Sequence, residues 1–240
     1  MDSNKKKHKV LIMIPAFNEE KTLEHVVNQI IDLYGEYDYI IINDGSTDRT
    51  PEICREKGYN FIDLPINTGL GIVIQTGFKY ALYNGYDYAV QFDCDGQHYP
   101  EYIEGLLTKA LEGYNLVIGS RFMNMKKGFK LRMLGSRILS LLIYLTTDRY
   151  IADPTSGFRI YDRDMMKFYA RDMNAYPEPD DLVYQLQRGK KIAEIPVEMG
   201  DRIAGLSYFN LITGAIFMLN MTISILFIQM FRKKRRDFYH

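Results

Sequence analysis

Short apolar runs and longer stretches with helical spacing alternate along the first half of the chain. The runs are rich in Ile and Val, as in strands buried on both faces of a parallel sheet. They lie at 9–14, 37–43, 59–64, 88–92 and 115–118. Between them, apolar residues recur every three or four positions, as at Leu23, Val26, Val27 and Ile30. This alternation predicts an α/β fold with a mostly parallel sheet flanked by helices.

Polar clusters follow these predicted strands, at the point where each strand ends. They comprise Asn18 and Glu19, Asp44, Asn67, Asp93 and Asp95, and Arg121. The carboxyl ends of parallel strands share one edge of the sheet, and ligands of such sheets bind in the crevice there. We therefore expect residues that are far apart in the sequence to form one site.

Asp93 and Asp95 stand one residue apart directly after an apolar strand and before Gly96. Alone, this pattern is more typical of a turn, where Asp is common for backbone reasons. Alternation along a strand places both carboxylates on one side. Mg²⁺ or Mn²⁺ binds such oxygen ligands together with water and a substrate diphosphate. With the other clusters, the pair predicts a nucleotide-diphosphate site in which Asp44 contacts the base, Glu19 the ribose, and backbone donors near Gly69 face the ligand.

Composition and missing motifs exclude several other classes. The formal net charge is zero, so no overall field favours nucleic acid as a partner. Two cysteines are too few for a disulfide framework or a structural zinc site. Gly69 and Gly71 lack the third glycine of a dinucleotide fingerprint, and neither a phosphate-binding Gly-Lys-Ser/Thr nor a Gly-x-Ser-x-Gly elbow occurs.

The two ends of the chain differ from its centre. Residues 1–8 form a basic arm without the apolar core of a signal peptide. No charged residue occurs from 203 to 231, and Arg232-Lys233-Lys234-Arg235-Arg236 follows. A helix over 209–231 would be long enough to cross a hydrocarbon core of about 30 Å. We interpret 203–240 as a membrane helix with a basic tail that binds anionic lipid; a buried helix with a solvated tail is the alternative.

A second apolar stretch at 129–147 is too short and too charged to span a bilayer. It fits an amphipathic helix at the membrane surface and an ordinary core helix equally well.

Five stretches in a fixed order make the sequence recognisable. They are Ile14-Pro15-Ala16-Phe17-Asn18-Glu19-Glu20, Asn43-Asp44-Gly45-Ser46-Thr47-Asp48, Asn67-Thr68-Gly69-Leu70-Gly71, Asp93-Cys94-Asp95-Gly96-Gln97-His98 and Asp153-Pro154-Thr155-Ser156-Gly157-Phe158-Arg159. The chain resembles the family 2 glycosyltransferases of the GT-A (Rossmann-like) fold. The last stretch resembles the branch that acts on polyprenyl and dolichol phosphate. The resemblance covers roughly 9–207, and we expect the catalytic domain at 9–202.

The resemblance implies a metal-dependent, inverting transfer of a hexose or N-acetylhexosamine from a UDP- or GDP-sugar to polyprenyl (undecaprenyl) phosphate. The cofactor would be Mg²⁺ or Mn²⁺, held by Asp93, Asp95 and Gln97. We expect the acceptor phosphate at Arg121, Arg132 and Arg202, and name Asp153, Arg121 and Asp181 as catalytic candidates. The expected nucleotide-sugar contacts are Pro15, Ala16, Asn18, Glu19, Asp44, Asn67, Gly69, Asp93, Cys94 and Asp95.

Two other functions stay open. A transferase that glycosylates a saccharide hydroxyl in cell-wall or capsule synthesis would need a carboxylate base, and Asp180 or Asp181 could supply it. The acidic run at 178–181 is equally well explained as a helix start. A non-catalytic nucleotide-sugar-binding subunit of a membrane complex is the other possibility, against which the intact Asp93 and Asp95 pair argues.

Nucleotide sugars are cytoplasmic, so the catalytic domain should lie on the cytoplasmic side of the cell membrane. A single crossing at 209–231 would place Arg232 to Arg236 on the other side, against the positive-inside rule. The segment would then lie along the interface, re-enter, or pair with other helices. We therefore expect a homo-oligomer or a small membrane-protein partner.

Overall fold

The computed structural model describes residues 8–123, 131–171, 178–202 and 211–228. Its elements in chain order are β1 (Val10–Ala16), α1 (Leu23–Tyr34), β2 (Asp38–Asp44), α2 (Thr50–Lys57), β3 (Phe61–Leu64), α3 (Leu70–Tyr83), β4 (Tyr88–Gln91), a 3₁₀ turn (Pro100–Tyr102), α4 (Ile103–Leu111), β5 (Leu116–Ser120), α5 (Leu131–Thr147), β6 (Arg159–Asp162), α6 (Arg163–Arg171), α7 (Pro179–Gln187), β7 (Ile192–Pro196), α8 (Leu211–Ile223) and a π turn (Ser224–Ile228).

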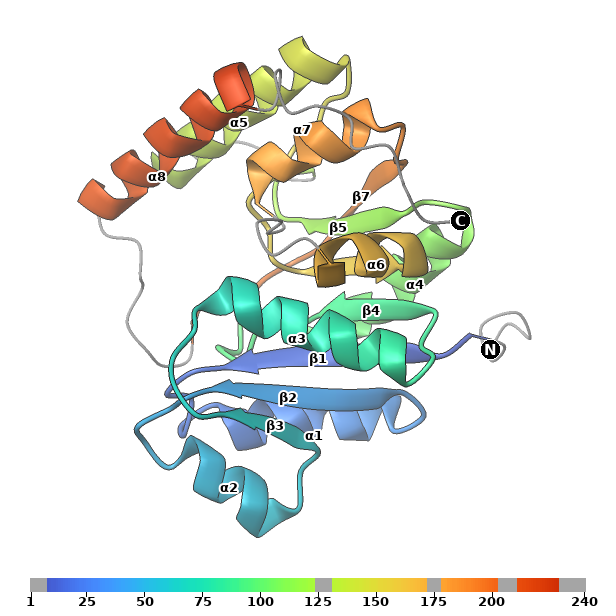
Figure 1. Cartoon of the computed structure of the whole chain (residues 1–240), viewed down its shortest axis with the longest axis vertical. Helices are drawn as coiled ribbons and strands as arrows, with labels where there is room; N and C mark the ends of the chain where they lie inside the picture. Colours follow the sequence, from blue (N-terminus) through green and yellow to red (C-terminus); the bar gives the residue numbers. More distant parts are fainter. Residues whose placement is uncertain (1–7, 124–130, 172–177, 203–210, 229–240) are drawn as a thin grey trace.

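In the described part of the chain, seven strands form one sheet in the order β3-β2-β1-β4-β6-β5-β7 (Figure 1). The sheet is mostly parallel, as the apolar runs predict, but β6 runs antiparallel to both β4 and β5. The sequence analysis did not identify β6, which is only four residues long. Because β6 runs in the opposite direction, the residues that precede it lie at the same edge as those that follow β4 and β5.

Helices cover both faces of the sheet, because side chains alternate along each strand. Leu11 and Met13 of β1 belong to one apolar core, which α3, α5, α6, α7 and α8 complete. Val10, Ile12 and Ile14 belong to the other core, which includes residues of α1 and α4. A strand buried on both faces has no polar side, which explains the continuous apolar runs.

Helix α8 packs against α5, and both lie at one end of the molecule (Figure 1). Met221 and Ile225 enter the core, and Ser224 donates a hydrogen bond to Asp180 Oδ2 on α7 (2.6 Å). The helix expected over 209–231 is therefore α8 followed by the π turn. Within the described residues, no helix combines the length and apolar character needed to cross a membrane. Residues 1–7 of the basic arm at 1–8 and the cluster Arg232 to Arg236 lie outside the described residues.

The outer surface of α5 and α8 is apolar. Leu139 and Ile143 of α5 are buried, while residues on its other side are exposed. We call the exposed set the α5/α8 apolar face; its members are 43 to 68 % exposed: Ile138, Leu141, Tyr144, Leu145, Ile216, Leu219, Ile223 and Phe227. Helix α5, which covers most of the stretch 129–147, thus packs one apolar side on the core and exposes a second apolar side.

Candidate functional site

The loops after β1 and β2 hold each other in place. Asn18, with a positive φ of 56°, donates from its backbone N–H to Ser46 Oγ (2.9 Å), and its Oδ1 accepts from Thr47 N–H (2.8 Å). Glu20 N–H likewise donates to Asp48 Oδ2 (3.1 Å). Asn tolerates the left-handed backbone region better than most residues. Two of the predicted nucleotide-binding motifs are therefore fixed to one another before any ligand binds.

Asp44, at the end of β2, holds the loop that precedes α3. Its Oδ1 accepts hydrogen bonds from Thr68 N–H and Oγ1 (both 2.7 Å), and its Oδ2 accepts from Gly69 N–H (2.9 Å). Gly45 lies under the same loop, where a Cβ would come within 2.4 Å of the Ile66 carbonyl carbon. The Asp44 carboxylate and the Gly69 N–H, both expected to face the ligand, are therefore bonded to each other here, and exposed Asn67 lies in the loop they anchor.

Asp93 is oriented by His98 and Gln91. The buried His98 ring stacks on Phe158 and accepts a hydrogen bond at Nδ1 from Asp93 N–H (3.0 Å). That bond leaves the proton on Nε2, which lies 3.6 Å from Asp93 Oδ2. Burial lowers the pKa of His98, which favours the neutral ring. Gln91 Nε2 donates to Asp93 Oδ1 (3.3 Å), and a Cβ on Gly157 would come within 3.0 Å of Oδ2.

Asp95 lies beside Arg202, whose Nη2 is 3.0 Å from Asp95 Oδ2. Gln97 N–H donates to the other oxygen, Oδ1, at 3.0 Å. Burial raises the pKa of Glu19 to about 7, and the nearby charge of Asp95 adds to this shift, while the hydrogen bond from Thr22 and the charge of Arg202 oppose it. The ends of β1 and β4 and the segment after β7 therefore meet at one edge, as the polar clusters predict.

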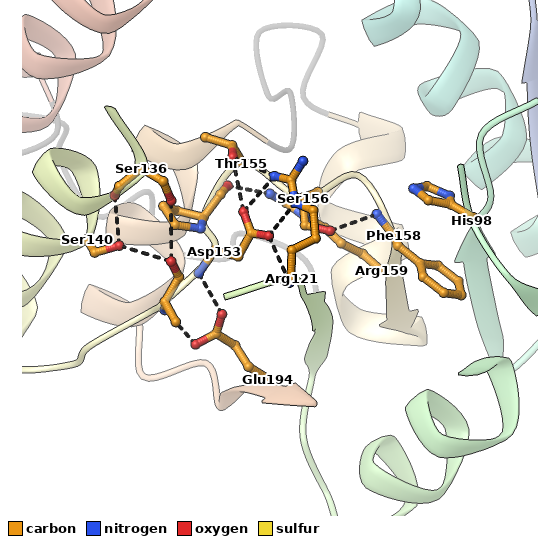
Figure 2. Close-up of polar contacts among 12 residues, drawn as sticks. His98, Arg121, Ser136, Ser140, Asp153, Thr155, Ser156, Phe158, Arg159 and Glu194 are labelled. Atoms are coloured by element: carbon orange, nitrogen blue, oxygen red, sulfur yellow. Dashed lines mark hydrogen bonds and ion pairs between the residues drawn. The ribbon is translucent and has the colours of Figure 1, made fainter. Parts of the chain in front are cut away.

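Arg121 is held by Asp153 in a two-pronged ion pair (Figure 2). Its Nε donates to Asp153 Oδ2 (2.7 Å) and its Nη2 to Oδ1 (2.8 Å), and its backbone N–H also donates to Oδ2 (3.1 Å). Thr155 Oγ1 accepts from Nη2 (3.0 Å). Asp153 is 0 % exposed, whereas the Arg121 side chain is 29 % exposed. Asp153 therefore orients Arg121, which is the member of the pair that reaches the surface.

Asp93 and Asp95 fit a divalent cation that is shared with a ligand. Their side chains are 33 % and 10 % exposed, and each is an oxygen donor of the type that Mg²⁺ and Mn²⁺ prefer. No group of three or more His, Cys, Asp or Glu within the described residues is placed to hold a metal. The remaining ligands would have to come from water and a diphosphate. Gln97 Nε2 donates to Gly200 O (3.2 Å), so this amide nitrogen is directed at the backbone.

Several predicted site residues lie elsewhere or are buried. Cys94, expected as a nucleotide-sugar contact, is 2 % exposed and lies in the apolar core that α1 covers. Asp181, expected as a catalytic candidate, is 2 % exposed and accepts a hydrogen bond from Tyr169 Oη (2.6 Å). It thus lies in the interior between α6 and α7. Ala16 is buried and Pro15 half-buried at the end of β1, and the Arg132 side chain lies outside the described residues.

Gly157, His98 and Glu194 contribute to the site, although the sequence pattern assigned none of them a separate role. Glu194 Oε2 and Oε1 accept from the N–H groups of Ala152 (2.6 Å) and Asp153 (2.8 Å). One signal was present: Glu194 is a lone charge inside the strand Ile192–Pro196. No signal in the sequence marked Gly157. A Cβ there would crowd Asp93, and that contact joins two segments that are far apart in the sequence.

Known proteins share both the sequence pattern and the fold. Residues 11–169 match the family model described as Glycosyl transferase family 2. The chain is 32% identical over 215 residues to UDP-N-acetylglucosamine–dolichyl-phosphate N-acetylglucosaminyltransferase of Methanococcus voltae, covering 79% of this chain and 84% of the relative. It is 30% identical over 211 residues to undecaprenyl-phosphate mannosyltransferase of Micrococcus luteus, covering 82% and 86%.

Among solved structures, glucosyl-3-phosphoglycerate synthase of Mycobacterium tuberculosis superposes with a TM-score of 0.70 at 20% identity, over 92% of this chain and 81% of that one. The same enzyme in complex with Mn²⁺, uridine diphosphate and phosphoglyceric acid superposes with a TM-score of 0.65 at 19% identity, over 92% and 79%. These two likenesses concern the fold alone. The match over residues 11–169, together with the relatives in sequence, shows that the chain belongs to glycosyltransferase family 2 and is a glycosyltransferase.

Proposed function

We propose that this protein is a metal-dependent, inverting glycosyltransferase that moves a hexose or N-acetylhexosamine from a UDP- or GDP-sugar to polyprenyl phosphate. The transfer would take place at the cytoplasmic face of the cell membrane. The relatives from Methanococcus voltae and Micrococcus luteus act, by their names, on dolichyl and undecaprenyl phosphate. The observation that carries the proposal is the meeting of two carboxylates and two guanidinium groups at one edge of the sheet.

These four groups divide into two functions. Asp93 and Asp95 would hold Mg²⁺ or Mn²⁺, which supplies positive charge to the diphosphate that leaves. Arg121 and Arg202 would bind the phosphate of the acceptor, because guanidinium groups match phosphate oxygens in geometry and charge. Arg202 Nη2 lies at Asp95 Oδ2 (3.0 Å), so the acceptor group and the metal group are immediate neighbours. The donor diphosphate and the acceptor phosphate would therefore meet between them.

The buried carboxylates favour a phosphate acceptor over a sugar hydroxyl. A hydroxyl needs a general base within hydrogen-bond reach, whereas a phosphate monoester is already ionised near neutral pH. Asp153 is 0 % exposed and holds Arg121, and Asp181 is 2 % exposed and holds Tyr169. Neither carboxylate is open to a substrate hydroxyl, and Asp180, the other candidate base, is half-buried and accepts a hydrogen bond from Ser224 Oγ at Oδ2 (2.6 Å). For a phosphate acceptor, positioning and charge neutralisation account for most of the catalysis.

The α5/α8 apolar face would bring the site to its lipid substrate. Residues of this face are 43 to 68 % exposed, and Arg137 is an exposed cation on the same helix. An apolar surface with cations beside it binds at the interface of an anionic membrane. Helix α5 also donates hydrogen bonds from Ser136 and Ser140 to Ala152 O, next to Asp153 (Figure 2). Helix α5, whose other side carries this face, is thus bonded through its buried side to the segment that holds Arg121.

The proposal is tested by incubating the full chain with radiolabelled UDP- and GDP-sugars, Mn²⁺ and undecaprenyl phosphate in anionic vesicles. We expect label in the lipid extract that depends on metal and acceptor phosphate. Label found only in added saccharide would support the hydroxyl-acceptor alternative instead. No transfer with any donor, while nucleotide still binds, would contradict the proposal and point to a binding subunit.

Placing a charge on the α5/α8 apolar face should weaken membrane binding. We expect Leu141→Glu and Leu219→Glu each to lower partition into anionic vesicles about tenfold or more, because a carboxylate at a buried interface position is costly. Flotation with vesicles measures the effect. Tyr83→Glu is the matched control, since Tyr83 is 92 % exposed at the end of α3, away from this face. Equal partition of all three variants would show that this face does not contact lipid.

A further inference from the structure

The peptide unit between Ala152 and Asp153 makes hydrogen bonds to side chains on two sides. On one side, Glu194 of β7 accepts from both Ala152 N–H (2.6 Å) and Asp153 N–H (2.8 Å). On the other, Ser136 Oγ (3.3 Å) and Ser140 Oγ (3.4 Å) of α5 donate to Ala152 O. Figure 2 shows Glu194 on one side of this segment and the two serines on the other. Ala152 and Asp153 belong to no helix or strand. Their backbone N–H and C=O groups therefore pair with these side chains instead of with the backbone of a neighbouring strand.

We propose that Glu194 is a positioning residue that sets the direction of the Arg121 guanidinium through the Ala152–Asp153 backbone. It touches neither donor nor acceptor in this scheme. The Glu194 carboxylate accepts hydrogen bonds from two consecutive backbone N–H groups and so fixes the backbone at Ala152 and Asp153. The fixed backbone determines the direction of the Asp153 side chain, and that side chain holds Arg121. The inference deepens the proposed function, because it rests on Arg121 as a ligand of the acceptor phosphate.

The contact pattern requires a carboxylate at position 194. Each of its two oxygens accepts one backbone N–H, so a glutamine would turn one donor–acceptor contact into a contact between two donors. Burial raises the pKa of Glu194, while the two N–H donors oppose this shift and the charge of Asp153 adds to it. Two carboxylates therefore sit close together in a partly buried place.

The series of hydrogen bonds that connects Glu194 to Arg121 is short at each step. After the 2.8 Å contact to Asp153 N–H, the Asp153 oxygens are 2.7 Å and 2.8 Å from Arg121 Nε and Nη2. Thr155 Oγ1 closes the arrangement, since it donates to Asp153 Oδ1 (3.1 Å) and accepts from Arg121 Nη2 (3.0 Å). Asp153 is 0 % exposed, so protein atoms enclose its side chain and leave it little room to reorient. A shift of the backbone at 152–153 must therefore move the guanidinium.

The test is a double-variant cycle with Glu194→Gln and Arg121→Ala. In the otherwise unchanged chain, we expect Glu194→Gln to lower kcat/KM for undecaprenyl phosphate about tenfold, because small misplacements of a binding group are costly. In the Arg121→Ala background, the same substitution should change kcat/KM by less than about twofold, since the group it positions is gone. Additive losses in the two backgrounds would overturn the proposal, as would an equal loss of nucleotide or Mn²⁺ affinity.

Asp162→Asn is the matched structural control. Asp162 is also a partly buried carboxylate that accepts a backbone N–H, from Met165 (2.8 Å), but it lies at the opposite edge of the sheet. We expect this variant to reproduce any loss of melting temperature without the loss of kcat/KM. If it lowers kcat/KM for the acceptor as Glu194→Gln does, the effect is one of stability and the proposal fails.

A readout without turnover separates this inference from the proposed function. The Arg121 Nε–H signal in NMR, assigned by its loss in Arg121→Lys, should shift and exchange faster with water in Glu194→Gln. If the unchanged enzyme transfers no sugar to lipid phosphate but the signal still moves, the positioning holds and the proposed function fails. An unmoved signal overturns the positioning, whatever the acceptor proves to be.

Discussion

Asp95→Asn is expected to reduce sugar transfer about 10³-fold while the chain stays folded. Asp95 is one of the two carboxylates that fit the cation, and asparagine has its shape without its charge. A neutral ligand would bind Mg²⁺ or Mn²⁺ much more weakly, so the charge on the leaving diphosphate would be met by fewer positive groups. The fold should tolerate the change because asparagine keeps an oxygen for the Gln97 N–H, and Arg202 is 32 % exposed and can turn to water.

The measurements are the transfer rate at saturating Mn²⁺, Mn²⁺ binding by calorimetry, and the melting temperature. Asp87→Asn is the control, because Asp87 precedes the same strand at its other end and accepts from Lys9 N–H (3.0 Å). It should leave all three quantities close to those of the unchanged chain. Near-normal, metal-dependent turnover by Asp95→Asn would remove the metal assignment.

The strand ends were the part of the site that the sequence could predict. Apolar runs located the parallel strands to within a few residues, and parallel strands carry their final residues to one edge. The charges of Asp95 and Arg202 both act on the pKa of Glu19, although the three residues are far apart along the chain. The five motifs that resemble family 2 glycosyltransferases fall on residues of this edge or on the loops that hold it.

Contacts that depend on pairing between distant segments could not be predicted. Strand β6 has four residues and a buried Arg159, so neither length nor alternation marks it. Its antiparallel direction is what delivers Asp153 to the Arg121 edge. The acidic run at 178–181 was ambiguous in the sequence, because an acid near a helix start is equally compatible with a base and with a capping position. The structure places Asp181 under Tyr169, in the interior.

The C-terminal segment was ambiguous for a different reason. A charge-free stretch meets the requirements of a membrane helix and of a helix packed on a core. Within the described residues, α8 and the π turn after it bury Met221 and Ile225 against the core and expose Ile216, Leu219 and Phe227. The hydropathy of a segment adds the residues of the buried and the exposed side together, so it cannot distinguish the two kinds of helix. Contacts with α5 and the core determine which residues of α8 are buried.

Asp153→Asn should cost both stability and transfer. Removing the charge leaves Arg121 without its partner, and breaking a buried ion pair costs about 3 to 5 kcal/mol. Because Arg121 is 29 % exposed and can be partly rehydrated, we expect the lower part of this range, with a fall in melting temperature of roughly 6 to 12 °C. Transfer to undecaprenyl phosphate should fall about 10²-fold, since the guanidinium loses the fork that orients it.

Arg121→Lys divides these two effects. Lysine keeps the positive charge next to Asp153 but presents a single ammonium in place of the two-pronged contact of Nε and Nη2. We expect a smaller loss of stability than in Asp153→Asn, measured by calorimetry, with a similar loss of kcat/KM for the lipid phosphate. If Arg121→Lys instead retains kcat/KM, charge alone serves the acceptor and the geometry of the pair is structural. If Asp153→Asn lowers the melting temperature but leaves kcat/KM unchanged, Arg121 serves the acceptor without its partner, and the ion pair contributes to stability alone.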